Sequence, residues 1–92
     1  MTLKLFHGSK LIGLIENPVP DELAHVGDIE LLPEAAAYAE LFAFFNDDEK
    51  RWSVEPPFKQ ELLKDWVVQD EQGSRNEIAV PVINGKGEIW WR

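Results

Sequence analysis

The chain has 92 residues, 45% of them hydrophobic and 11% aromatic, which is typical of one small globular domain and unlike a disordered chain. It contains no cysteine, which excludes disulfides, thiolate metal ligands and a cysteine nucleophile, and which fits a cytoplasmic location. Its net charge of −8 argues against nucleic acids and anionic membrane surfaces as partners.

The negative charge is concentrated in residues 21–50. Nine acidic residues and one lysine there sum to −8, while the segments 1–20, 51–75 and 76–92 sum to +1, −1 and 0. Two interpretations fit this pattern: a solvated face that aids solubility, or a docking face for a basic protein partner. The densest acidic run, and the candidate for such docking, is Asp47, Asp48 and Glu49.

A β-hairpin is expected at the N-terminus, from residues 2–7 and 10–16. Glycine at the first position of the two-residue turn 8–9 favours a type II′ turn. A two-residue loop pairs His7 with Lys10, Leu5 with Ile12 and Leu3 with Leu14. The period of two then places one aliphatic face on the core and the other face away from it. The core face carries Leu3, Leu5, Ile12 and Leu14, and the opposite face includes Phe6, Leu11 and Ile15.

Residues 17–32 are expected to contain little strand. Pro18 and Pro20 predict the end of the hairpin, because proline cannot donate to a β-ladder. Residues 21–26 are expected to form one helical turn that stops at Gly27. Residues 28–32 are compatible either with a short strand or with a lead-in to the next helix.

The main helix is predicted to begin at Pro33, a residue favoured at the first helical position, and to end near Asp48. A second, short helix is expected over residues 56–65. The buried stripe of the main helix follows helical spacing and leaves Phe44 outside it. Its members are Tyr38, Leu41, Phe42 and Phe45.

The C-terminal part predicts a three-stranded meander between residues 66 and 92. A polar loop at 71–75 and a hairpin signal at Asn84-Gly85 separate the three strands. Pro81 lies inside the middle strand, where a bulge or a break is expected. One side of the meander joins the core with Trp66, Val68, Ile78, Val80, Val82, Ile89 and Trp91.

These elements predict a single α+β domain over residues 1–92. A mostly antiparallel sheet of about five strands, from the hairpin and the meander, would carry the two helices on one face. Its other face would bear large apolar side chains, which need to be shielded from water. Residues 17–32, a second copy of the chain or another partner would cover this face. The candidate interaction residues on that face are Phe6, Leu11, Ile15 and Trp90.

No residue pattern indicates catalysis. His7 and His25 have no second histidine at ligand spacing, and no serine lies in a Gly-x-Ser-x-Gly context. No cofactor, metal site or catalytic residue is therefore expected. The sequence favours a non-catalytic protein-interaction domain. Two alternatives are an inhibitor or immunity-type protein that neutralises a basic enzyme, and a small-molecule-binding domain with a pocket between sheet and helices.

The apolar second face predicts a two-fold symmetric homodimer in which Trp90 lies at the interface. Trp90→Glu is expected to weaken self-association without unfolding the domain, because a charge in an interface is costly to bury. Sedimentation at several protein concentrations measures this. A wild-type chain that stays monomeric at every concentration would contradict the dimer.

Overall fold

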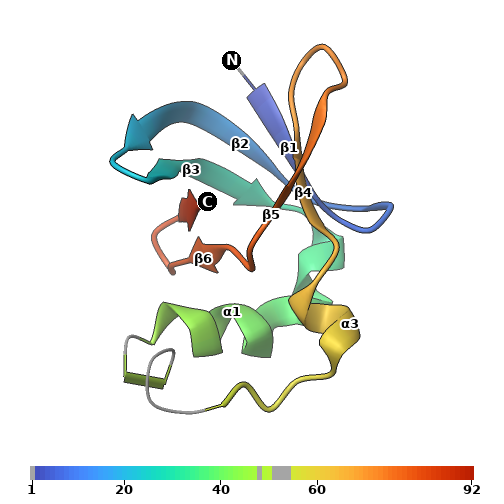
Figure 1. The fold of residues 1–92 in the computed structure, drawn as a ribbon, viewed down its shortest axis with the longest axis vertical. Coiled ribbons are helices and arrows are strands. Elements are labelled where there is room, and N and C mark those ends of the chain that lie inside the picture. Colours follow the sequence, from blue (N-terminus) through green and yellow to red (C-terminus); the bar gives the residue numbers. More distant parts are fainter. Residues whose placement is uncertain (1, 48, 51–54) are drawn as a thin grey trace.

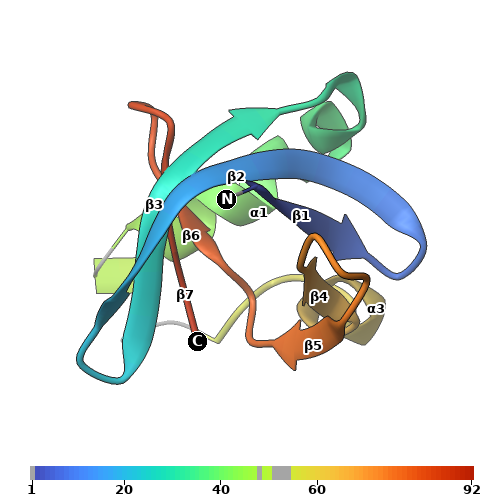
Figure 2. The same ribbon diagram turned by 90° about the horizontal axis from the view of Figure 1, so that it is seen from above.

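In the part of the chain that the structure describes, seven strands form one curled antiparallel sheet, seen from two sides in Figures 1 and 2. The computed structural model describes residues 2–47, 49–50 and 55–92. The order in the sheet is β5-β4-β1-β2-β3-β7-β6. The α+β class is confirmed, and the expectation of about five strands is wrong. The strands are β1 (Thr2–His7), β2 (Lys10–Asp21), β3 (Ala24–Leu31), β4 (Trp66–Gln69), β5 (Arg75–Ile78), β6 (Val82–Ile83) and β7 (Glu88–Trp91).

The helices lie together below the sheet in the view of Figure 1. The predicted start at Pro33 is confirmed, but the first turns, η1 (Pro33–Tyr38), are a 3-10 helix. The α-helix α1 (Ala39–Asn46) follows, and the second predicted helix is reduced to α3 (Gln60–Leu63). Asp48, the predicted end of the main helix, lies outside the described residues.

The N-terminal hairpin contains a β-bulge that the alternation of residues did not predict. Gly8 takes the expected positive φ of 63°, and the pairs next to the turn match the prediction. Beyond Phe6 the register shifts, so that Leu5 lies opposite Gly13 and Ile12 is the extra residue. The shift places Ile15 in the core, whereas Leu14 is only half-buried. The predicted faces of these two residues are therefore wrong.

Strand β2 does not end at its prolines. It continues to Asp21 and pairs with β3 around a turn at Glu22-Leu23, where a helical turn was predicted. Strand β1 pairs with β2 only as far as Glu16, so beyond that point one side of β2 has no ladder in the described residues. A proline there removes no donor that this side needs, which explains why Pro18 and Pro20 are tolerated.

The predicted C-terminal meander is broken at Pro81. Strand β5 pairs with β4, while β6 pairs with β7, and the two lie at opposite edges of the sheet. The break itself was expected, but it also separates the strands into two pairs. Trp66 lies opposite Ile78, because the loop occupies residues 70–74 rather than the predicted 71–75.

The β6–β7 turn also places Val82 on the side of the sheet opposite to the predicted one. Ile83 pairs with Ile89, and the backbone N–H of Asn84 donates to the carbonyl of Glu88 (3.1 Å), so three residues form the loop. Gly87 supplies the positive φ of 81° that such a loop requires. Ile83 is consequently buried beside Ile89, and Val82 is half-buried on the opposite side with Trp90.

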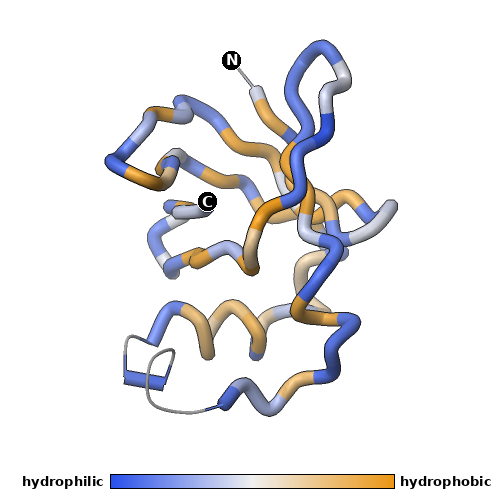
Figure 3. Tube along the Cα trace, viewed as in Figure 1, coloured by the Kyte–Doolittle hydropathy of each residue, from blue (hydrophilic) through white to orange (hydrophobic). Residues whose placement is uncertain are grey.

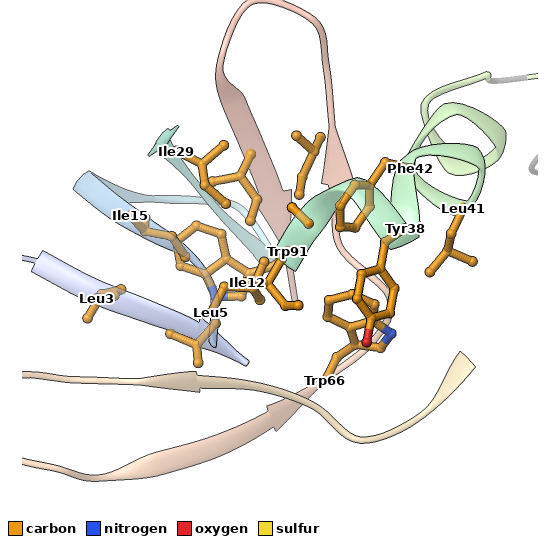
Figure 4. Close-up of a cluster of buried hydrophobic side chains, with 14 residues drawn as sticks. Leu3, Leu5, Ile12, Ile15, Ile29, Tyr38, Leu41, Phe42, Trp66 and Trp91 are labelled. Carbon is orange, nitrogen blue, oxygen red and sulfur yellow. The ribbon is translucent and has the colours of Figure 1, made fainter. Parts of the chain in front are cut away.

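The core fills the concave side of the curled sheet, and this side is called the inner face below. The convex side is the outer face. The side chains of η1 and α1 close the inner face from one end, with Tyr38 and Phe42 against Trp66 (Figure 4). Hydrophilic residues gather instead in the loop between β4 and β5 (Figure 3). Predicted core residues that are buried are Leu3, Leu5, Ile12, Tyr38, Leu41, Phe42, Trp66, Val68, Ile89 and Trp91.

Phe44, which was predicted to lie off the buried stripe, is buried. Its ring meets those of Phe45 and Phe58 edge-on, at centroid distances of 5.2 and 5.6 Å. The chain after residue 55 thus covers a second side of α1, which a single-stripe interpretation of the helix did not include. Phe45 and Phe58 themselves are half-buried.

The packing of α1 predicts a large cost for truncating Phe42. Its side chain is 5% exposed and contacts Tyr38 and Trp66, so Phe42→Ala should lower the free energy of unfolding by about 3–5 kcal/mol. Denaturant titration measures this. Leu23→Ala, at a side chain that is 86% exposed, is the control and should change little. A loss below about 1 kcal/mol for Phe42→Ala would contradict the packing described.

Candidate functional site

The apolar candidate residues do not form one continuous patch. Phe6 and Leu11 pair across β1 and β2, while Trp90 lies on β7, which β3 separates from β2. Ile15 is fully buried, so its predicted place on the outer face is wrong. The Arg75 guanidinium covers Phe6, at 4.6 Å from its ring centroid. Trp90 is therefore separated from the other candidates.

The acidic candidates Asp47 and Glu49 are exposed, and Asp48 lies outside the described residues. The Asp47 carboxylate accepts hydrogen bonds from the backbone N–H groups of Glu49 (3.0 Å) and Lys50 (3.2 Å). Asp47 thereby satisfies donors that follow the end of α1, which is a local capping role. A role in docking for this run stays a prediction.

A second set of carboxylates, which the sequence did not single out, forms a row across three strands. Glu16 on β2 lies opposite Asp28 on β3, and Asp28 lies opposite Glu88 on β7. Directly opposed residues of antiparallel strands project to the same side, with Cβ atoms about 5 Å apart. All three side chains are exposed. Three negative charges are thus aligned on the outer face.

Each carboxylate of this row accepts a hydrogen bond from a neutral side chain. Glu16 accepts from the Thr2 hydroxyl (2.8 Å). Asp28 accepts from the amide of Asn17 (3.1 Å). Glu88 accepts from the Asn84 amide, at 2.8 Å. These donors orient the carboxylates without adding a positive charge, so the charge of the row is not neutralised by them.

An apolar row runs beside the carboxylates. Val26 on β3 lies opposite both Val19 on β2 and Trp90 on β7, and Trp90 lies opposite Val82 on β6. Val19 is 51% exposed and the other three are half-buried. The row and the carboxylates Asp28 and Glu88 line a groove of about 450 Å³, to which Asn46 of α1 also contributes.

Asn17 connects the two rows. Its φ of 52° lies in the left-handed region, which asparagine adopts more readily than most residues. The β2–β3 register is irregular between Glu16 and Val19, so Asn17 sits where β2 bends. The bend brings the amide of Asn17 onto Asp28 and lets Val19 resume the pairing with Val26. The sequence did not predict this arrangement, because Pro18 and Pro20 were interpreted as the end of the strand.

The histidine beside the first turn is half-buried and packs against aromatic side chains of the core. His7 Nε2 must donate to the backbone carbonyl of Glu61 (2.7 Å), because a carbonyl can only accept. In the neutral ring, Nδ1 then accepts from the Tyr38 hydroxyl, at 2.8 Å. The ring also lies 4.8 Å from that of Trp66. These contacts join β1 to η1 and α3.

No metal-binding cluster of three His, Asp or Glu side chains occurs within residues 2–47, 49–50 and 55–92. None of the helices in those ranges is long and apolar enough to cross a membrane. Comparison of the chain with protein-family models, with curated proteins and with solved structures finds no match.

The carboxylate row predicts that repulsion lowers stability. Asp28 lies between two other carboxylates, so Asp28→Asn, which keeps an acceptor for Asn17, should raise the free energy of unfolding by about 0.5 kcal/mol. Urea titration at low salt measures the gain, which should fall in about 1 M salt. The control is Glu77→Gln, because Glu77 is an exposed strand residue opposite Val67. A loss of stability in Asp28→Asn would contradict the repulsion.

Proposed function

We propose that the protein is a non-catalytic interaction domain that binds a basic protein partner in the groove on its outer face. The observation that supports the proposal is the alignment of Glu16, Asp28 and Glu88 beside an apolar row. Directly opposed like charges weaken a sheet. None of the hydrogen-bond donors of these three carboxylates is a cation. A cationic side chain of a partner protein would account for their alignment, because it would offset the repulsion.

Lysine and arginine side chains fit such a surface. Each has an apolar stem that covers hydrophobic area and a cationic head that favours carboxylates. A stem lying over Val26 and Trp90 would bring its head to Asp28 or Glu88, because these pairs are neighbours on β3 and β7. The ring of Trp90 also attracts a guanidinium: Arg92 lies 5.2 Å from its centroid.

The net charge of −8 adds a long-range contribution to the proposal. A strongly acidic domain attracts a basic partner before contact and speeds their association, while it repels nucleic acid and anionic membranes. An inhibitor or immunity-type protein that blocks a basic enzyme is the more specific form of the same function. The absence of cysteine fits a cytoplasmic site of action.

The absence of catalysis is part of the proposal. The three carboxylates of the row accept hydrogen bonds from one hydroxyl and two amides. These donor groups do not act as acids or bases near neutral pH. His7 is engaged by Tyr38 and the backbone of Glu61, so its ring nitrogens already have partners. The groove is thus better suited to holding a ligand than to transferring a proton.

A defined peptide tests the proposal. A labelled peptide that alternates lysine with valine should bind, whereas its glutamate counterpart should not, as measured by fluorescence anisotropy. Glu88→Gln should weaken binding by up to about fivefold, because it removes one charge pair. Raising the salt concentration should weaken binding of the lysine peptide to the wild type.

The matched control is Glu77→Gln, the same change at an exposed strand residue outside the groove. It should bind the lysine peptide as the wild type does. Trp90→Ala should also weaken binding, because it removes the largest apolar surface in the groove. Equal effects of Glu77→Gln and Glu88→Gln would contradict the proposal, since they would show attraction to net charge alone.

A further inference from the structure

A second hollow lies on the other side of Trp90, between the helices and the C-terminal part of the sheet. Its volume is about 730 Å³, within the range of about 300–1,000 Å³ that is typical of small-molecule sites. Phe45 of α1 and Leu63 of α3 line it from one side, and Val80 and Val82 line it from the other. The hollow is thus a pocket between sheet and helices.

The chemistry of the lining is apolar with one charge. Apart from Arg92, every lining residue within the described part of the chain carries an aliphatic or aromatic side chain or is proline or alanine. The Arg92 guanidinium lies 5.2 Å from the centroid of the Trp90 ring, which lines the same pocket. A cation next to apolar walls favours a ligand that combines a hydrocarbon body with an anionic group.

We propose that this pocket binds a small apolar carboxylate, with the hydrocarbon between Leu63 and Val80 and the carboxylate on Arg92. The net negative charge of the protein disfavours the binding of anions in general. Selectivity for this ligand therefore depends on the local positive charge of Arg92. The bidentate geometry of a guanidinium suits a carboxylate better than it suits a neutral hydroxyl. The expected ligand class is therefore a medium-chain or aromatic acid.

This inference does not rest on the proposed function. The acidic groove and the pocket share Val82 and Trp90. Asp28 and Glu88 line the groove and not the pocket, whereas Leu63 and Arg92 line the pocket and not the groove. A variant such as Glu88→Gln should bind the carboxylate as the wild type does. Failure of one proposal therefore leaves the other testable.

Octanoate and octanol, which share a hydrocarbon chain, are the probes. Titration of the isotopically labelled protein followed by NMR should show saturable shifts at the amides of Leu63, Val80 and Val82 and at the Trp90 indole. Octanoate should bind more tightly than octanol. Arg92→Gln should weaken octanoate binding by about tenfold, because it removes a charge-assisted hydrogen bond, and leave octanol binding unchanged.

Arg75→Gln is the matched control. Arg75 also lies over an aromatic ring, that of Phe6, but on the strands at the other side of the sheet and outside the pocket. It should bind octanoate as the wild type does. Three results would each overturn the proposal: equal affinities for octanoate and octanol, an unchanged affinity in Arg92→Gln, or shifts that cluster away from the pocket.

Discussion

The bulge at Ile12 is the feature on which the rest of the sheet depends. It changes which residues of β2 point inward, so that Ile12 and Ile15 both enter the core, while β2 pairs with β1 on one side and with β3 on the other. Bulges increase the local twist of a strand pair, and the sheet curls around a core that η1 and α1 complete. The tight approach of β2 and β3 leaves no space for a side chain at Gly13, where a Cβ would lie 2.9 Å from the carbonyl oxygen of Glu30.

A curled sheet has two unequal surfaces, and this inequality creates the candidate sites. The inner face is filled by large aliphatic and aromatic side chains. The outer face keeps the carboxylates of three strands in line, because the register that buries Ile15 and Ile29 also places Glu16 opposite Asp28. The break at Pro81 and the turn between β6 and β7 then place Val82 opposite Trp90. The groove and the pocket are thus consequences of the same registers that form the core.

The sequence predicted the parts of the fold that short-range chemistry determines. Gly8 and Pro33 marked a turn and a helix start, and the spacing of Tyr38, Leu41 and Phe42 identified the buried side of α1. It failed where a long-range partner decides the outcome. Prolines are compatible with β2 only because its pairing with β1 ends at Glu16, and no local pattern in the sequence shows where the pairing with a neighbouring strand ends.

The same limit explains why the candidate site was predicted only in part. Trp90 was singled out from its position on the last strand, whereas the carboxylate row depends on the pairing of β2, β3 and β7. Asp28-Ile29-Glu30 does alternate between charged and apolar residues, which is a signal for a strand with one charged side. The partner residues of this segment, 14–16, lie in the predicted hairpin, but no local pattern shows that these two segments pair with each other.

An open sheet exposes two edges, and each is a potential start for the joining of separate molecules into fibres. One edge here is β6, which is two residues long and preceded by Pro81, so it offers little backbone for an added strand. The other is β5, whose Arg75, Asn76 and Glu77 are polar and exposed. An incoming strand would have to align with these polar and charged side chains. The sheet is therefore open, but its edges disfavour aggregation.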